Sequence, residues 1–88
     1  MDVQLGRAAA KALDKLERPD QLRIRQRLTD LEAIPPQPPD YKHLSGHPRW
    51  YRIRSGDFRI CYKIVDGIVS VGVIANRRDV YARLERAV

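Results

Sequence analysis

In residues 50–62, two arginines at alternate positions precede a turn signal and a third follows it. Two alternating runs flank Ser55-Gly56, and this pattern predicts a β-hairpin. Closing the turn at that dipeptide places Arg52 directly opposite Arg59, and the period of 2 puts Arg54 on the same face. Because like charges directly opposite each other destabilise a sheet, we interpret the three arginines as a binding site for an anion, in particular RNA phosphate.

Two further residues, which come later in the sequence than the hairpin, also suit phosphate and RNA binding. Arg77 follows the strand expected to pair beside Arg59, and Tyr81 comes one helical turn later. Guanidinium groups hold phosphate bidentately, and a tyrosine ring stacks on an unpaired base. The set suits a reaction in which a pentacoordinate phosphate gains negative charge. The alternative is that these arginines only form a solvated surface or contact an acidic partner.

The sequence contains no pattern typical of a metal site, a reactive thiol, a phosphate-binding loop or a catalytic triad. His43 and His47 fall in a loop with no second ligand pair at metal-binding spacing. Cys61 falls in the middle of a strand, where it reads as a small apolar residue. There is no glycine-rich phosphate loop and no Ser/His/Asp arrangement. We therefore expect no cofactor and no metal site.

Length and charge point to one small basic domain that spans residues 1–88. The net charge is +6, and residues 35–88 hold ten basic against five acidic groups, while residues 1–34 hold seven against six. A basic excess on one part of a domain is typical of a nucleic-acid binder. A single cysteine excludes an internal disulfide, and the sequence shows neither a membrane-spanning stretch nor a signal peptide. We expect a cytoplasmic protein with no membrane partner.

Two helices are predicted in the first 34 residues. Apolar side chains recur at helical spacing from Arg7, and alanine is the best helix former. Pro19 then fits the first turn of a second helix, whose stripe contains Ile24 and Leu31. The short connection predicts an antiparallel helical hairpin. Residues 2–5 could form a short edge strand, and the proline run at 34–40 reads as a rigid connector rather than a ligand for SH3-type domains.

A second hairpin follows the first. Asp66-Gly67 is a strong turn signal, and closing it pairs Val65 with Ile68, Tyr62 with Val71, and Ile60 with Val73. Residues 80–87 read as a short C-terminal helix. The fold class is α+β, with the helical hairpin on one face of a small antiparallel sheet and the other face open and basic. The expected core face carries Phe58, Tyr62, Ile64, Val69, Val71 and Val73, and the expected opposite face carries Arg59, Cys61, Lys63, Ser70 and Gly72.

Three segments resemble a known family. Residues 51–62 (YRIRSGDFRICY) resemble the strand pair of the RelE/ParE toxin superfamily, and residues 76–81 (NRRDVY) resemble its C-terminal motif. Residues 42–46 (KHLSG) look like the lysine-leucine-x-glycine step before the sheet. With the helical hairpin, the resemblance covers nearly the whole chain and implies a RelE-like fold.

The resemblance also implies an activity. RelE-like toxins of type II toxin–antitoxin systems are ribosome-dependent endoribonucleases (mRNA interferases) that cut mRNA in the A site. The 2′-hydroxyl attacks the adjacent phosphate without a metal. The implied partners are a cognate antitoxin, the ribosome with its mRNA and, only through the antitoxin complex, operator DNA. The implied catalytic residues are Arg52, Arg54, Arg59, Arg77 and Tyr81, and the implied RNA-binding residues are Lys42, Lys63, Asn76 and Arg78.

The site departs from the family in its proton-transfer groups. Asn76 stands where relatives often have histidine or lysine, and arginine is effectively never deprotonated. We therefore expect the arginines to act by electrostatic stabilisation and Tyr81 to orient the base and assist proton transfer, with His43 or His47 as a possible titratable group. Two alternatives stay open: a ParE-like toxin that inhibits DNA gyrase, and a catalytically weak module that only binds an antitoxin.

Overall fold

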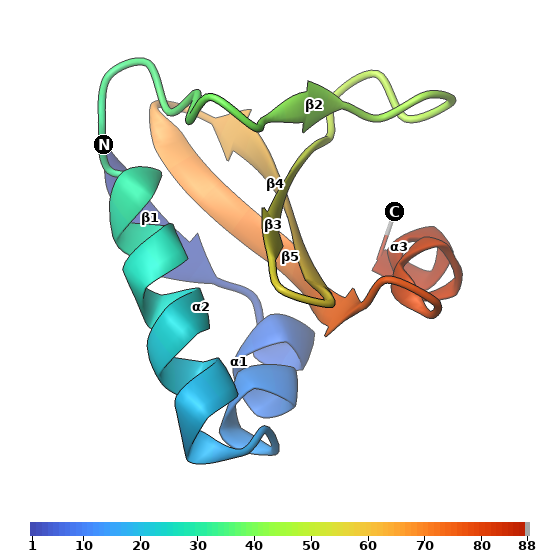
Figure 1. The fold of residues 1–88 in the computed structure, drawn as a ribbon. Coiled ribbons are helices and arrows are strands. Elements are labelled where there is room, and N and C mark those ends of the chain that lie inside the picture. The colour runs from blue at the N-terminus through green and yellow to red at the C-terminus, as the bar shows by residue number, and fades with distance from the viewer. Residues whose placement is uncertain (88) are drawn as a thin grey trace.

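The computed structural model describes residues 1–87, which form a five-stranded sheet with helices on both faces (Figure 1). The strand order is β1-β5-β4-β3-β2, with β1 parallel to β5 and the other neighbours antiparallel. The predicted α+β class is confirmed. The elements are β1 (Asp2–Leu5), α1 (Arg7–Asp14), α2 (Arg18–Asp30), β2 (Lys42–His43), β3 (Tyr51–Ser55), β4 (Phe58–Val65), β5 (Ile68–Asn76) and α3 (Val80–Ala87).

The helices α1 and α2 bury one face of the sheet, as their apolar spacing predicts. Ala9 and Leu13 of α1 and Ile24 of α2 are fully buried in the main core. Pro19 lies in the first turn of α2, where its missing N–H costs no helical hydrogen bond. The sheet contributes Ile53, Ile60, Tyr62, Val69, Val71 and Ile74 to this core.

The opposite face of the sheet is only partly open, which corrects one expectation. Val80 and Leu84 of α3 pack against Cys61 and Val73 in a second apolar cluster, which Trp50 completes. In Figure 1, α3 lies on the other side of the sheet from α1 and α2. The reason is that this face carries apolar side chains as well as arginines, and α3 removes them from water. The basic surface is confined to what α3 and the 44–50 loop leave uncovered.

The first hairpin has the predicted faces but a different register. Its two-residue loop is Gly56-Asp57, so Ser55 pairs with Phe58 and Arg54 pairs with Arg59. The expected pairing of Arg52 with Arg59 is therefore wrong. Gly56 has φ 57°, which glycine adopts without steric cost, so the turn closes one residue later than predicted. Each residue of β3 therefore pairs with a β4 residue two positions beyond the predicted one, and a shift of two leaves every side chain on its predicted face.

The second hairpin follows the prediction up to a β-bulge. Val65 pairs with Ile68 and Tyr62 with Val71, but Cys61 then pairs with Val73 because Gly72 is an extra residue. The predicted pairing of Ile60 with Val73, and the place of Val73 on the main core face, are wrong. The Trp50 ring lies so close to Gly72 that a Cβ there would be 2.4 Å from a ring atom. Glycine thus allows both the bulge and the tryptophan's close approach.

The proline run serves as a packed connector between α2 and β2. Pro36 and Pro38 are buried, and the carbonyl of Pro36 accepts a hydrogen bond of 2.8 Å from the Tyr62 hydroxyl. This packing agrees with the connector interpretation, because a ligand for SH3-type domains needs accessible prolines. Within residues 1–87, no helix is both long enough and apolar enough to cross a membrane.

Candidate functional site

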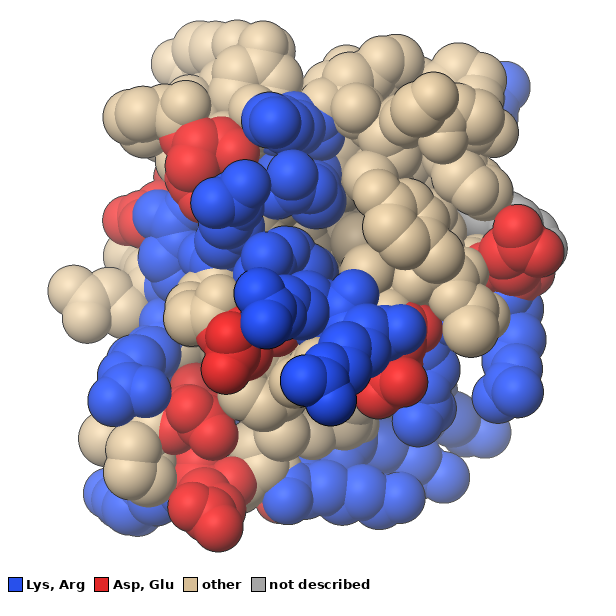
Figure 2. Space-filling model, turned by 45° about the vertical axis from the view of Figure 1, so that its right-hand side comes forward, with Lys and Arg blue, Asp and Glu red and all other residues tan. Residues whose placement is uncertain are grey.

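Four predicted arginines lie close together at the open end of the sheet's second face. Arg54 and Arg59 form a cross-strand pair, Arg52 lies two residues along β3 on the same face, and Arg77 follows the end of β5. We call Arg52, Arg54, Arg59 and Arg77 the arginine cluster. Figure 2 shows lysine and arginine side chains gathered in a band across one face of the molecule, with acidic side chains beside it.

The charges of this cluster act on one another. Burial and the neighbouring charges of Arg52, Arg54 and Arg77 together lower the pKa of the Arg59 guanidinium. Nη1 of Arg59 donates hydrogen bonds to the carbonyls of Gly56 (3.1 Å) and Phe58 (3.0 Å), which fold the side chain back over the turn. The result is a concentrated positive potential that an anion would relieve.

The carboxylate of Asp57 lies beside the arginine cluster and offsets only a little of its positive charge. The carbonyl of Asp57 accepts a 2.8 Å hydrogen bond from the Arg77 N–H, which ties the end of β5 to the β3–β4 turn. Its carboxylate lies 4.0 Å from Nε of Arg77, with both side chains well exposed. An exposed pair at this distance contributes little, so most of the positive charge remains available.

Arg52 has an unsatisfied donor. Its Nη1 is buried and has no hydrogen-bond partner in the part of the chain that the structure describes. A buried guanidinium N–H without an acceptor is costly and rare. Cys61 is its cross-strand partner. Burial raises the pKa of the Cys61 thiol to about 11, although the Arg52 charge lowers it in part. The thiol is thus protonated at neutral pH and supplies no acceptor anion.

The predicted lysines lie on the same face as the cluster. Lys42 on β2 pairs with Arg52 and is exposed. Lys63, further along β4, has its Nζ 5.2 Å from the centroid of the Trp50 ring, a cation–π contact. Both lysines extend the positive face beyond the arginine cluster.

The C-terminal candidates occupy the turn between β5 and α3. The side-chain oxygen of Asn76 accepts a 3.0 Å hydrogen bond from the Arg78 N–H and so closes this turn. Arg78 is exposed and, with Arg77, lines an open hollow of about 580 Å³. Tyr81 is 57% exposed in the first turn of α3. Among residues 1–87, no hydrogen bond or ring contact joins Tyr81 to the arginine cluster.

The histidines lie away from the arginines. His43 pairs with Tyr51, whose side chain is on the main core face, and the two rings are 5.0 Å apart. Nε2 of His43 also contacts the carbonyl of Pro48. His47 sits in the following loop, where its main chain bonds to Leu44 and Trp50. The geometry therefore favours neither histidine as a general base for a phosphate bound at Arg59.

Two residues that contact the main chain of the cluster were not predicted from the sequence. Asp40 and Arg27 hydrogen-bond the N–H and the carbonyl of Arg54. Neither lies in a recognisable motif, and only the register of β2 against β3 brings Asp40 to this position.

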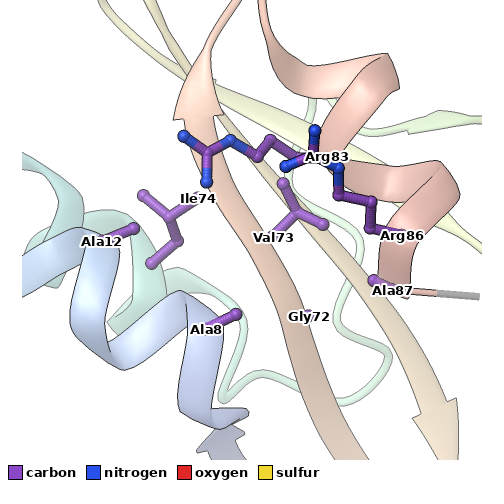
Figure 3. A pocket seen from close by; sticks show the side chains of 8 residues that line it. All are labelled: Ala8, Ala12, Gly72, Val73, Ile74, Arg83, Arg86 and Ala87. Carbon is purple, nitrogen blue, oxygen red and sulfur yellow. The ribbon is translucent and has the colours of Figure 1, made fainter.

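An apolar cavity of about 140 Å³ lies elsewhere, between α1, β5 and α3 (Figure 3). Figure 3 shows Ala8 and Ala12 on one side and the arginines of α3, Arg83 and Arg86, on the other. No member of the arginine cluster lines it. Its chemistry is that of a packing gap and does not suit phosphate.

We compared the fold of this chain with the structures of known proteins. The chain is similar to the free E. coli toxin RelE, solved as a double mutant, with a TM-score of 0.75 and 22% identity over 99% of this chain and 97% of that one. The intact E. coli RelBE toxin–antitoxin complex matches with a TM-score of 0.71 and 24% identity, over 85% of this chain and 94% of that one. These matches confirm the predicted RelE-like fold.

The archaeal RelE–RelB complex from Pyrococcus horikoshii OT3 is also similar, with a TM-score of 0.70 and 26% identity over 86% of this chain and 93% of that one. Residues 3–81 match the family model described as ParE toxin of type II toxin-antitoxin system, parDE, and the chain belongs to this family. It is thus a toxin of a toxin–antitoxin system with a RelE-like fold. No curated protein sequence matches the chain.

Proposed function

We propose that this toxin is a ribosome-dependent endoribonuclease that cleaves mRNA by attack of a 2′-hydroxyl on the adjacent phosphate. The observation that carries the proposal is the arginine cluster, in which Arg54 lies directly opposite Arg59 and shares its face with Arg52. Burial, and after it the charges of Arg52, Arg54 and Arg77, lower the pKa of Arg59. A toxin that only needed a soluble surface would gain nothing from this repulsion. A pentacoordinate phosphate, whose negative charge grows in the transition state, benefits from such preorganised positive charge.

Each member of the cluster has a role in this proposal. Arg54 and Arg59 hold the scissile phosphate from two neighbouring strands, and Arg52 adds its positive charge from two residues along β3. Arg77 stabilises the same charge from the end of β5, while Tyr81 stacks on the adjoining base. The 2′-hydroxyl loses its proton as its oxygen bonds to phosphorus, and the leaving 5′-oxygen takes up a proton as its bond to phosphorus breaks. The products are a 2′,3′-cyclic phosphate and a free 5′-hydroxyl. Tyr81 assists proton transfer, and the guanidinium groups supply charge stabilisation.

The remaining predicted cations bind RNA on either side of the scissile phosphate. Lys42 on β2 and Lys63 on β4 contact the RNA on one side, and Arg78 and Asn76 contact it beside the hollow at the end of β5. Phosphate contacts of this kind fix position and register and carry no sequence preference. The ribosomal A site with its mRNA is the proposed substrate complex, which places the activity in the cytoplasm.

Induction in growing bacteria, followed by primer extension on a translated message, tests the proposal. We expect translation-dependent cuts within codons, lost with Arg59→Ala. Arg25→Ala is the matched control, because this arginine is exposed on α2 and does not line the hollow that contains Arg54. Cuts that persist with Arg59→Ala, or growth arrest with an intact message, would overturn the proposal.

The family match favours one second function, a toxin that inhibits DNA gyrase by binding, since the matching family is that of ParE toxins. The same induced cells distinguish it, because gyrase trapped on DNA together with an intact message would support this reading. Neither cuts nor trapped gyrase would indicate a catalytically weak, antitoxin-binding module.

We further propose that a cognate antitoxin neutralises this toxin and that any contact with operator DNA is made through their complex. The support is that similar RelE chains are seen in complexes with RelB. Co-expression with the product of a neighbouring small acidic reading frame should abolish growth arrest, and the two chains should co-purify.

A further inference from the structure

The main chain of Arg54 lies at an edge of the sheet that no strand covers. β2 pairs with β3 only at Lys42–Arg52 and His43–Tyr51. The same register, continued by two residues, puts Asp40 opposite Arg54. Asp40 is not part of a strand, and the edge groups of β3 would be open here.

Side chains replace the missing strand at this point. Oδ2 of Asp40 accepts a 3.1 Å hydrogen bond from the Arg54 N–H, and Nε of Arg27 donates a 2.9 Å hydrogen bond to the Arg54 carbonyl. Arg27 is also ion-paired with Asp40, and its Nη1 lies 2.6 Å from Oδ2 of Asp30. We call Arg27 and Asp40 the clasp, since they join α2, the proline connector and β3.

The clasp is better placed than an ordinary surface ion pair. The Arg27 side chain is 24% exposed and the Asp40 side chain 37%. Burial alone would raise the pKa of Asp40, but the hydrogen bonds from Arg54 and Arg27 outweigh it and hold the pKa below its ordinary value. The carboxylate therefore stays charged at neutral pH and keeps both of its hydrogen-bond partners.

Arg54 needs such support because its cross-strand partner repels it. Arg54 and Arg59 are a directly opposed like-charge pair, which destabilises a sheet locally. On β3, Arg54 is near the turn and beyond the reach of β2. Without an anchor on its outer side, repulsion would widen this end of the hairpin.

We infer that Arg27 and Asp40 are positioning residues, which hold the Arg54 main chain so that its guanidinium and that of Arg59 can bind one anion together. The inference rests on the proposed function where it takes that anion to be RNA phosphate. Neither clasp residue touches the anion, and each acts through Arg54.

A double-mutant cycle on anion binding tests this role. The wild-type toxin is titrated with inorganic pyrophosphate, and the Nε–Hε NMR signals of Arg54 and Arg59 report binding. We expect Asp40→Asn to weaken binding roughly three- to tenfold and to have no further effect in an Arg54→Ala background, the coupling expected of residues in contact. Asp20→Asn is the matched control, because it removes an ion pair with Arg23 on α2, the helix that also carries Arg27, and it should leave the affinity unchanged.

A second variant guards against a general loss of structure. Arg27→Lys keeps the positive charge beside Asp40, but one ammonium nitrogen replaces the three guanidinium nitrogens that contact Arg54, Asp30 and Asp40. Because the charge is retained, it should weaken binding less than Asp40→Asn, while far-UV circular dichroism stays native. The inference is overturned by equal losses with and without Arg54, by no loss at all, or by wild-type pyrophosphate binding that leaves the Arg54 signal unmoved.

Failure of the proposed function would look different. If the wild-type toxin shows the coupling but never cuts a translated message, the endoribonuclease proposal falls and the positioning role stands. If the message is cut and Asp40→Asn cleaves as well as the wild-type toxin, with no coupling in the cycle, only the positioning role falls.

Discussion

Arg54 on β3 and Arg59 on β4 lie directly opposite each other, so one cross-strand pair of the sheet joins two like charges. The burial of Arg59 and the nearby charges of Arg52, Arg54 and Arg77 all lower its pKa. Such an arrangement lowers the stability of the free protein and favours an anion-bound state. It links the stability of this hairpin directly to its proposed function.

Removing one charge of this pair should stabilise the free toxin. Arg54→Gln keeps most of the side chain's length and relieves the repulsion of Arg59, so we expect the free energy of unfolding to rise by about 0.2–1 kcal/mol at low salt. The gain should shrink in about 1 M salt, which screens exposed charges. Urea unfolding followed by circular dichroism measures both values. Arg25→Gln, at an exposed position on α2, is the control. A loss of stability with Arg54→Gln at low salt would contradict the prediction.

The thiol of Cys61 should be inert in the folded protein. It is fully buried, and burial raises its pKa from 9.0 to about 11. The native toxin should therefore react with a thiol reagent at neutral pH only as fast as it unfolds. Thiol-labelling rates with and without urea measure this. Rapid labelling of the native protein would show that α3 does not cover this face in solution.

The raised pKa of Cys61 also makes the free energy of unfolding depend on pH in the alkaline range. Between pH 9 and about 11 the unfolded chain releases the Cys61 proton while the folded chain keeps it, so the free energy of unfolding falls as pH rises. One pKa unit corresponds to about 1.4 kcal/mol. Cys61→Ala should be less stable at pH 8 and should show a shallower decline above pH 9. An unchanged slope would be evidence against the buried, protonated thiol.

Gly72→Ala should destabilise the fold through Trp50. An added Cβ would lie 2.4 Å from the ring, so the tryptophan or β5 must move, and overpacking of this kind costs about 1–3 kcal/mol. The double variant Gly72→Ala with Trp50→Ala should lose less stability than the sum of the single variants, since the clash disappears. Circular dichroism in urea gives all three values. Additive losses would mean that the two residues do not touch.

Local rules were sufficient to predict the elements of this fold. Alanine-rich helical spacing, Pro19 at a helix start and the Asp66-Gly67 turn predicted helices and strands where the structure has them. The period of 2 placed Arg52, Arg54 and Arg59 on one face, and this survived the error in register because the shift was by two residues. The candidate arginine cluster was accessible from the sequence for the same reason.

Tertiary contacts decided what the sequence did not reveal. The choice between Ser55-Gly56 and Gly56-Asp57 as the turn depends on backbone conformation, and both are plausible turn dipeptides. The burial of Cys61 depends on α3 crossing back over the sheet, although the four-residue spacing of Val80 and Leu84 hinted at an apolar face. The contact of Asp40 with Arg54 depends on the path of the proline connector, which no periodicity encodes.

Acid should weaken the clasp between Arg27 and Asp40 once the Asp40 carboxylate takes up a proton. Hydrogen bonds from Arg54 and Arg27 outweigh the effect of burial and lower the pKa of Asp40 below 3.8. The folded chain then holds this proton less tightly than the unfolded chain, so the stabilisation is present above that ordinary value and is lost as pH falls through the lower, folded pKa. Asp40→Asn should be less stable than the wild-type toxin at pH 6, and the difference should narrow toward pH 3. Urea midpoints of both proteins across this range measure the effect, with Asp20→Asn as the control. A difference that is constant with pH would mean that the Asp40 carboxylate charge does not hold β3 in place.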